Sequence, residues 1–535
     1  MIVDLNSSQE LPELQCDICI VGAGAAGLAL ATELLGTRQN VVLLESGGMD
    51  LEPSTQSLYD VDITGLPHAG ATQGRFRVCG GSTTKWGGQA LPLMPSDFEK
   101  RDWVEHSGWP LSFGELKTYY DRACRFLLVD SLHVDDDLLD YLHARLPAFD
   151  PQKLWYHFSK WSPRPSLRET YLPALRDSKQ CRVVLHANVT RIVLDGSLRR
   201  VQSVIARSLA GKNVTVQPKI LVLCVGGIET ARLLLSNDTQ QTAGIGNGRD
   251  LVGRFFQDHP NAMVGWVRPE NPSQAQRYFN VFHKRRLKYS VRCTATAAWQ
   301  KENRTLNASM GITFVQDGTL FQEMRDLHAA LRGGNINADF FRQLARVAAH
   351  PLQAVIPVWH YAFRGRSFAP GAGLRVGLTC EQQPDPESRI LLSEHTDALG
   401  VRRANVRWKL TEMVWTTLQR FAALLEDQFQ AAGLGRIEFD PWFQQGAAGW
   451  REQISDQYHH MGTARMHDSP AYGVVDRNCR LHEVSNLYLA GSAVFPTSGH
   501  SNPTLTILAL SMRLADQIKA GLIHSPPPLH VILFK

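Results

Sequence analysis

A glycine-rich turn after a short apolar strand near the amino terminus constrains the fold more than any other feature of this sequence. Residues 16–21 (CDICIV) read as a buried strand, and Gly22, Gly24 and Gly27 follow it in a GxGxxG pattern. Residues 28–35, rich in Ala and Leu, favour a helix. In such units the first glycine permits the tight turn, the second admits a pyrophosphate, and the third lets the helix pack on the strand. The pattern predicts a Rossmann-type dinucleotide site.

A second strand completes this βαβ unit and ends at an acidic residue. Residues 41–44 (VVLL) form the strand, and Glu45 follows at the distance expected for an acid that binds a ribose hydroxyl. An acid rather than a base argues against NADP, but the motif alone does not separate FAD from NAD. Ala25 and Ala26, inside the turn, and Ser46, after the acid, are further contacts that we expect for the dinucleotide.

The length of 535 residues is too great for one hydrophobic core and predicts more than one lobe. Residues 220–225 form a wholly apolar strand followed by Gly226 and a helix, which we expect in the same parallel sheet as the first unit. Extended stretches between 261 and 443 suggest an antiparallel sheet. We therefore expect an α/β fold (α+β overall), in which a discontinuous Rossmann-type domain accompanies a substrate domain built on an antiparallel sheet with helices. The expected cofactor domain comprises residues 1–95, 181–260 and 444–535, and the expected substrate domain comprises residues 96–180 and 261–443.

The charge and the apolar pattern limit the partners and the compartment. The net charge is only +5, from 56 basic and 51 acidic residues without a basic cluster, so we expect no nucleic-acid partner. No apolar run is long enough to span a bilayer, and residues 1–15 lack the pattern of a secretory signal. Nine cysteines without repeated spacing are expected as reduced thiols. These features predict a cytoplasmic protein without a transmembrane segment.

Two groups of residues could suggest a metal site. His459, His460 and His467 lie close together in the sequence, but no further cysteines or carboxylates complete a ligand set. Cys16 and Cys19 are three positions apart on a predicted strand and therefore point to opposite faces. We expect no bound metal.

Several segments resemble the glucose-methanol-choline (GMC) family of FAD oxidoreductases, and the match at the carboxyl terminus is the most specific. The loop from Gly80 to Gln89 and the segment Cys380-Glu381-Gln382 look closest to bacterial sugar- and polyol-oxidising members. The resemblance implies FAD rather than NAD. The matching segments are the GxGxxG turn, Gly80-Gly81-Ser82 with Trp86, VGRFFQDHP (252–260), HHMGTARM (459–466) and residues 486–516.

The resemblance also implies roles for individual residues. His500 matches the active-site histidine, which accepts the hydroxyl proton as the alcohol carbon gives hydride to flavin N5, and Asn502 matches the residue that holds the substrate oxygen. An ordinary histidine pKa lies near neutrality, which suits a general base. Gly226 is expected to join the FAD site. The other positions with expected FAD contacts are Gly81, Ser82, Trp86, Gly87, Val189, Gly491, Ser492, Asn502, Pro503 and Thr504.

Asn502 has a second interpretation. Pro503 and Thr504 read as the start of a helix, so the Asn502 carbonyl could cap that helix. Both roles can hold together, because a cap uses the carbonyl oxygen and leaves the amide donors free.

The segment Thr83-Thr84-Lys85-Trp86 departs from some sugar oxidases of the family. Those proteins attach FAD covalently through a histidine at the position that Lys85 occupies here. We therefore expect non-covalent FAD. The role of Lys85, as a solvated or a phosphate-facing side chain, stays open.

These features predict an FAD-dependent enzyme that oxidises a CH–OH group with His500 as general base. The expected substrate is a small-molecule alcohol, such as a sugar, a polyol or another hydroxylated metabolite. The alternative is an FAD-containing lyase or photoenzyme of the same fold, without net alcohol oxidation. The electron acceptor is either O2 or a separate carrier or quinone, since the chain has no haem motif of the CxxCH kind. The sequence leaves oxidase and dehydrogenase open.

Overall fold

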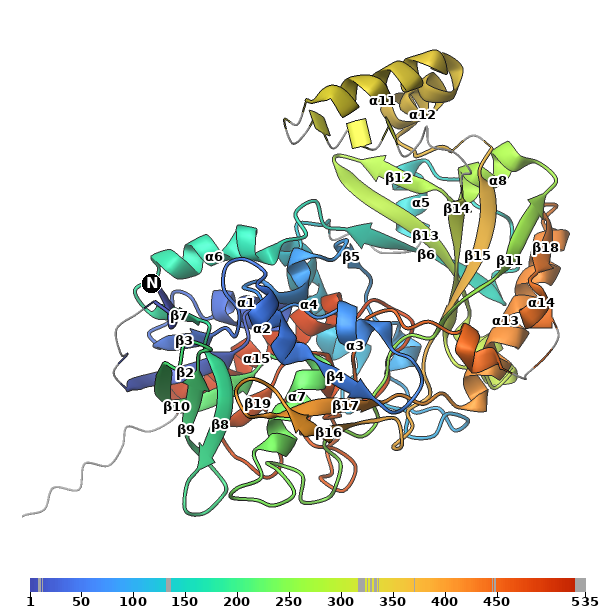
Figure 1. The fold of residues 1–535 in the computed structure, drawn as a ribbon. Coiled ribbons are helices and arrows are strands. Elements are labelled where there is room, and N and C mark those ends of the chain that lie inside the picture. Colours follow the sequence, from blue (N-terminus) through green and yellow to red (C-terminus); the bar gives the residue numbers. More distant parts are fainter. Residues whose placement is uncertain are drawn as a thin grey trace, which may run out of the picture.

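A computed structural model describes most of the chain (Figure 1). It contains two eight-stranded sheets and one three-stranded sheet. The described residues are 1–7, 11, 13–130, 136–315, 323–324, 326–327, 330–331, 334, 336–369, 371–444, 446 and 449–524.

The first sheet contains the predicted βαβ unit. Its buried strands β2 and β3 pair in parallel, and β10 pairs in parallel with the other side of β2, as the continuous apolar runs predict. Strands β8 and β9 extend the sheet in antiparallel fashion. The strands are β1 (Ile2–Asp4), β2 (Leu14–Val21), β3 (Val41–Leu44), β7 (Cys181–Leu185), β8 (Asn188–Leu194), β9 (Val201–Arg207), β10 (Asn213–Leu223) and β19 (Leu487–Leu489).

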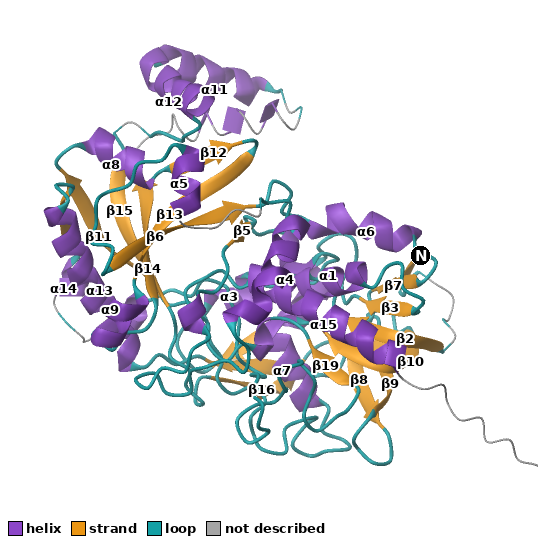
Figure 2. Cartoon of the chain, turned by 180° about the vertical axis from the view of Figure 1, so that it is seen from behind, coloured by secondary structure: helices purple, strands orange, loops and turns teal. Residues whose placement is uncertain are grey.

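Helices from distant parts of the chain accompany this sheet. Helix α1 (Ala25–Glu33) starts directly after the glycine turn and packs against α15 (Thr504–His524), which in turn packs against α4 (Phe113–Phe126). Helix α6 (Leu167–Asp177) also packs against α1, and α7 (Gly226–Ser236) follows β10. The carboxyl-terminal helix therefore lies beside the amino-terminal dinucleotide unit (Figure 2).

The second sheet is antiparallel throughout. Helix α13 (Glu412–Ala431) packs on β14, β15 and β18 (Figure 1). The strands are β5 (Gln89–Ala90), β6 (Leu154–Trp161), β11 (Asn261–Pro269), β12 (Val281–Lys284), β13 (Leu287–Ala295), β14 (Ala308–Val315), β15 (Gly373–Cys380) and β18 (Gly435–Phe439).

A small third sheet and a helical pair complete the fold. Strands β4 (Val61–Ile63), β16 (Arg389–Thr396) and β17 (Arg402–Arg407) form the sheet, and α7 packs against β16 and β17. Helices α11 (Ala338–Ala349) and α12 (Pro351–Arg364) project from the far end of the second sheet (Figures 1 and 2).

Short elements connect these parts. The short α-helices are α2 (Pro53–Gln56), α3 (Ala69–Gln73), α5 (Asp136–Leu142), α8 (Pro272–Phe279), α9 (Ala297–Glu302) and α14 (Pro441–Gln444). The 3-10 helices are η1 (Ser57–Tyr59), η2 (Gly81–Thr84), η3 (Pro95–Asp97), η4 (Trp450–Gln453) and η5 (Ser492–Val494).

The expected fold class, with a Rossmann-type unit and a separate antiparallel sheet, is confirmed. The domain ranges stay a prediction. Strand β5, inside the expected cofactor range 1–95, pairs with β6 of the second sheet. Strands β16 and β17, inside the range 261–443, pair instead with each other and with β4.

Candidate active site and dinucleotide cradle

The glycine turn is built as the sequence predicts. Gly22 has a φ of 99°, and a Cβ there would lie 2.6 Å from the carbonyl oxygen of Cys224. A Cβ on Gly27 would lie 1.8 Å from the carbonyl oxygen of Gly22. Only glycine fits at both positions, and the close contact lets α1 begin directly at the end of β2.

Other predicted glycines leave the backbone uncovered. A Cβ on Gly24, Gly226 or Gly491 would meet nothing within 4 Å. Gly81 lies next to the turn, since its Cβ would be 3.1 Å from Gly24 Cα. A pyrophosphate group binds where backbone without side chains lies beside the start of a helix. Helix α1, which begins at Ala25, provides that start.

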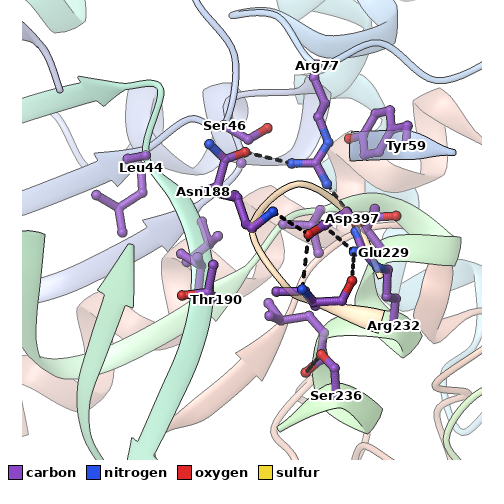
Figure 3. A pocket seen from close by; sticks show the side chains of 18 residues that line it. Leu44, Ser46, Tyr59, Arg77, Asn188, Thr190, Glu229, Arg232, Ser236 and Asp397 are labelled. Carbon is purple, nitrogen blue, oxygen red and sulfur yellow. Dashed lines mark hydrogen bonds and ion pairs between the residues drawn. The ribbon is translucent and has the colours of Figure 1, made fainter. Parts of the chain in front are cut away.

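A pocket opens beside this turn (Figure 3). Three predicted residues line it, namely Gly22, Ser46 and Val189. Its polar wall is an ion-pair network that the sequence did not reveal: Glu229 binds Arg77 at 3.0 Å and Arg232 at 3.1 Å.

Glu229 remains ionised in this buried network. It also binds Arg75 at 2.9 Å. Burial alone would raise the pKa of Glu229, but the three guanidinium groups lower it to about 2.

Glu45 lies at the end of β3, buried, as predicted. Its Oε2 accepts a hydrogen bond from Ala23 N at 2.7 Å, and its Oε1 accepts one from Gly47 N at 2.8 Å. Burial raises the pKa of Glu45, and these two bonds oppose the rise. The carboxylate thus connects the glycine turn to the strand that follows the helix.

The predicted catalytic residues line one narrow cavity, whose wall includes residues of strands β6, β13 and β15 of the second sheet. His500 and Asn502 come from the loop before α15. The wall also includes Leu91, Ser159, His259, Arg292, Thr379, Gln457 and His459. A larger cavity of about 570 Å³ includes Thr294 and Leu505 in its wall.

A chain of hydrogen bonds fixes the amide of Asn502. Asn502 Nδ2 lies 3.4 Å from His459 Nε2, and His459 Nδ1 lies 2.8 Å from His259 Nδ1. His259 Nε2 lies 3.3 Å from Ser498 O. Ser498 O can only accept, so the proton of His259 lies on Nε2 and its Nδ1 accepts from His459 Nδ1. His459 Nε2 then accepts from the Asn502 amide, so each hydrogen bond is donated in the direction from Asn502 to Ser498. Within the described part of the chain, the second amide hydrogen and the carbonyl oxygen of Asn502 have no partner and could contact a ligand.

His500 has a partner that the sequence does not indicate. Its Nε2 lies 3.1 Å from Nε2 of His157, which is fully buried on β6. Thr294 Oγ1 lies 3.1 Å from His157 Nε2 and 3.5 Å from His500 Nε2. Among the described residues, neither histidine has a hydrogen-bond partner at Nδ1.

These histidines are neutral at pH 7. Burial lowers the pKa of His157 to about 3, and Arg292 adds to this effect. Burial lowers the pKa of His459 to about 3 as well. The pKa of His500 lies well below its ordinary value, because of burial first and then because a proton on His500 would be repelled by one on His157 or His259 and by the charge of Arg292. A neutral imidazole can accept a proton.

The remaining predicted positions flank this cavity and the glycine turn. Ser82 Oγ donates to Gly74 O at 3.0 Å, and Trp86 Nε1 donates to Pro165 O at 2.7 Å. Ser492 is buried and donates from Oγ to His460 O at 2.6 Å. Other predicted residues fall at element starts or loops: Ala26 is in the first turn of α1, Pro503 precedes α15, Thr504 begins it, and Gly87 and the exposed Lys85 follow η2.

His460 joins a second cluster rather than the active-site cavity. Ligand atoms of His68, Asp258 and His460 lie within 4.8 Å of one another, a spacing that could hold a metal ion. His68 Nδ1 accepts a bond from Ala71 N, so its proton lies on Nε2, which faces Asp258 at 3.3 Å. A protonated Nε2 cannot bind a metal. The absence of a metal stays a prediction.

Known proteins resemble this chain over nearly its whole length. Two models of GMC oxidoreductase, for the amino- and carboxyl-terminal parts, match residues 155–261 and 384–511. The fructose dehydrogenase large subunit of Gluconobacter japonicus is 24% identical, over 94% of this chain and 98% of that protein. The chain belongs to the GMC oxidoreductase family.

Solved structures agree with this GMC fold. Pyridoxine 4-oxidase from Mesorbium loti aligns with a TM-score of 0.59 and 18% identity, over 94% of this chain and 99% of that chain. An FAD-dependent oxidoreductase from Chaetomium thermophilum aligns with a TM-score of 0.57 and 16% identity, over 95% and 100%. The predicted FAD cofactor and the predicted oxidation of CH–OH groups are confirmed for this GMC oxidoreductase, and the lyase alternative is not supported. Within the described residues, every helix is too short or too polar to cross a bilayer.

The sequence does not indicate His157, Arg292 or the role of His259 in the site. His157 and Arg292 lie opposite each other on β6 and β13. The QDHP segment gave no signal that its histidine contacts His459, because the two are 200 residues apart.

Proposed function

We propose that this GMC oxidoreductase oxidises a small-molecule alcohol in the cavity where His500 and Asn502 meet. The observation that carries the proposal is a neutral, buried His500 beside a free Asn502 carbonyl oxygen and amide hydrogen. An imidazole can take the proton of a substrate hydroxyl, and an amide can hold the oxygen from which that proton leaves.

The glycine turn and the pocket beside it fit FAD. The open backbone at Gly24, Gly226 and Gly491 would accommodate the pyrophosphate, and Ser46 and Val189 would hold the adenosine end. We assign the remaining predicted positions to the same cofactor, including Gly81 beside Gly24 and the start of α15 at Thr504. Bound FAD would supply the two-electron oxidant for the substrate carbon.

The protein's own groups manage the proton. His500 takes the hydroxyl proton on a ring nitrogen, and the Asn502 amide orients the substrate oxygen. The imidazolium formed at His500 lies beside the neutral ring of His157. His157 Nε2, which is 3.1 Å from His500 Nε2, can accept a hydrogen bond from it when His157 Nε2 carries no proton. Burial makes the charged ring costly, so the proton leaves His500 readily after the reaction.

Three finer points belong to the proposal. FAD is bound without a covalent link, since Lys85 stands where a linking histidine would be. The protein works in the cytoplasm, which is supported by nine free, buried cysteines. The electron acceptor is O2 or a separate carrier or quinone.

Anaerobic flavin bleaching tests this function. The purified holoprotein is mixed with a panel of polyols, sugars and hydroxy acids, and the absorbance of oxidised flavin is followed. At least one alcohol should bleach it, and re-oxidation with air or with a soluble quinone then identifies the acceptor. Denaturation should release all FAD into the supernatant. Flavin that no alcohol bleaches would contradict the oxidation, and flavin retained on precipitated protein would contradict non-covalent binding.

A further inference from the structure

Arg292 places an unneutralised guanidinium in the active-site cavity. Within the described part of the chain it forms no ion pair with a carboxylate, and its hydrogen bond runs from Nη1 to Thr379 Oγ1 at 3.4 Å. Burial is the cause that lowers the pKa of Arg292, and no acidic neighbour raises it. Several buried arginines here are paired, as Arg101 is with Glu381 at 2.6 Å, but Arg465 is also buried and, among the described residues, has no ion pair. Of Arg292 and Arg465, it is Arg292 that lines the active-site cavity.

The second sheet makes room for this side chain. Arg292 lies on β13 directly opposite His157 of β6, so both point to the same face of the sheet. On the other side, a Cβ at Gly311 of β14 would lie 3.3 Å from Arg292 Nη1. Gly377 of β15 pairs with Gly311, but the Met263 side chain lies over Gly377, since a Cβ there would be 3.1 Å from Met263 Sδ. The guanidinium thus lies over the backbone of Gly311 and lines the same cavity as His500.

The other groups in the cavity wall leave the positive charge uncompensated. His157, His459 and His500 are each affected by Arg292, whose charge lowers their pKa values. The rest of the wall consists of apolar or neutral polar side chains. Arg292 is partly buried. A charge withdrawn from water without a partner is costly, so an anion bound beside the guanidinium would stabilise this arrangement.

We propose that Arg292 binds the carboxylate of the substrate, and that the natural substrate is a hydroxycarboxylate, such as a sugar acid. The proposal rests on the alcohol oxidation proposed above and narrows its substrate class. The planar guanidinium matches a carboxylate in a two-point fork, and Thr379 and Ser159 supply hydroxyl groups in the same wall. One cation balances one carboxylate, whereas a phosphate dianion would leave an excess negative charge in a buried site.

The reaction is balanced without change to the carboxylate. The hydroxyl proton would pass to His500, the substrate carbon would give up a hydride for which bound FAD would be the two-electron oxidant, and the C–O bond would become a carbonyl. The substrate thus loses two electrons and two protons, and its carboxylate stays with Arg292 throughout.

Matched pairs of compounds test the carboxylate subsite. Gluconate and sorbitol share a six-carbon polyhydroxy chain, as glycerate and glycerol share a three-carbon one, and only the acids carry a carboxylate. We expect the acid of at least one pair to bleach the flavin with a KM at least 10-fold lower than its neutral partner. Arg292→Met should raise that KM on the order of 10²-fold, as expected when one partner of a buried charge pair is removed. KM for the neutral partner should change far less than KM for the acid, and Arg292→Lys should recover part of the loss seen with the acid.

A binding measurement separates this inference from the proposed function. Hexanoate, which has no hydroxyl group, should perturb the visible spectrum of the oxidised holoprotein, and Arg292→Met should abolish the effect. Arg268→Met, which removes an exposed arginine of the same sheet, is the matched control. If neutral alcohols bleach the flavin and Arg292→Met alters both members of each pair equally, the carboxylate subsite is wrong while the oxidation stands. If no compound bleaches the flavin, the oxidation fails, and the hexanoate titration alone decides the subsite. The carboxylate subsite would also be overturned if Arg292→Met shifted the reduction potential of the flavin but still bound hexanoate.

A separate surface carries a second inference. Ten of the eighteen exposed large apolar side chains on the described part of the chain lie between residues 331 and 363. Most belong to α11 and α12, which project from the rest of the molecule (Figure 1). Phe341 is 60% exposed and Phe363 is 76% exposed. Exposed apolar area of this density marks an interaction surface.

The charges of this pair of helices indicate the partner. Residues 338–364 contain Arg342, Arg346 and Arg364 but only one acid, Asp339. Arg342 pairs with Asp339 and Arg346 with Glu323, so among the described residues Arg364 is the arginine of this set without an ion pair. Exposed Trp359 and Tyr361 accompany these cations. Basic residues with exposed Trp, Tyr and Phe are typical of helices that lie in the interface of an anionic membrane. A second copy of the same surface would bring like charges together.

The geometry points to a membrane surface as the occupant of α11 and α12, which would bring the enzyme to a lipid-soluble acceptor such as a quinone. Flotation of the holoprotein with vesicles tests this. It should float with vesicles of phosphatidylcholine and phosphatidylglycerol, and less with phosphatidylcholine alone. The double variant Trp359→Ser, Phe363→Ser should lose at least 10-fold in binding, while Tyr472→Ser, at a 63% exposed aromatic elsewhere, should not. Absence of flotation, or loss of an oligomer in the double variant without any vesicle binding, would overturn the proposal.

Discussion

His157 and His500 are 343 residues apart in the chain, yet their Nε2 atoms lie 3.1 Å from each other. Only one of the two nitrogens can carry a proton in this contact if both rings are neutral. The pair therefore fixes complementary tautomers and sets the orientation of the proposed base. Thr294 contacts both rings and closes the arrangement.

This contact predicts a role for His157 in positioning. In His157→Leu, His500 loses both a hydrogen bond and a neighbour that lowers its pKa. We expect flavin reduction to slow about 10-fold at pH 7, the low end of what a positioned acid–base group contributes. The acidic limb of the pH profile should move to higher pH. Stopped-flow reduction between pH 5 and 9 measures both; a limb that does not move would show that His157 is only structural. His283→Leu, on β12 of the same sheet, is the control.

The buried histidines also predict how stability depends on pH. Their folded pKa values lie below the ordinary value of 6.5, at about 3 for His157 and His459. Below pH 6.5 the unfolded chain takes up protons that the folded protein excludes, so the free energy of unfolding falls as the pH drops toward 3. Each histidine contributes roughly 1.4 kcal/mol per pH unit in this range. Urea unfolding at pH 7.5, 6.5 and 5.5 should show the loss, and His157→Leu should reduce its slope. Constant stability over this range would be inconsistent with neutral buried rings.

Gly499, next to the proposed base His500, occupies a position that requires glycine. Its φ is 54°, and a Cβ there would lie 2.6 Å from Asp97 Oδ2. Gly499→Ala must therefore displace the loop that carries His500, and we expect flavin reduction to slow at least 10-fold while FAD stays bound. Gly196→Ala is a suitable control, because a Cβ there meets nothing within 4 Å. Unchanged reduction kinetics in Gly499→Ala would show that the loop tolerates the shift.

Glu229 predicts the behaviour of the dinucleotide pocket. Glu229→Gln leaves Arg75 and Arg77 without their carboxylate, and removal of one partner from a buried ion pair costs about 3–5 kcal/mol. We expect a lower urea midpoint and loss of FAD on dialysis. Glu438→Gln removes an exposed partner of Arg268 and should change stability by less than about 1 kcal/mol. Equal stability of the two variants would contradict a structural role for the network.

The sequence is sufficient to predict the dinucleotide unit, because its information is local. Gly22, Gly27 and the strands β2 and β3 on both sides of them lie within residues 14–44, and Gly27 packs on Gly22, although Gly22 also packs on the distant Cys224. Glu45 also lies where the spacing predicts, although its observed partners are the backbone groups of Ala23 and Gly47. Whether it binds a ribose stays a prediction.

The rest of the active site could not be derived in this way. His157 and Arg292 become neighbours only through the pairing of β6 with β13, and the spacing of residues along the chain does not encode that register. The same holds for the Glu229 network, which joins α7 to the loop after α3. Pairing across a sheet depends on the whole fold, so a polar residue in a strand reads as surface until its partner is known.

The central claim, that His500 is the proton acceptor, is tested most directly by anaerobic flavin reduction in His500→Ala. The variant should bind FAD as the parent does, because the cradle at Gly22 and Gly24 is separate from the ring. Stopped-flow bleaching with an alcohol that reduces the parent should be roughly 10²–10⁴-fold slower, the contribution of a positioned general base. Asn502→Ala should be slowed less. Bleaching of His500→Ala at the parent rate would contradict the account and would move the base to His459.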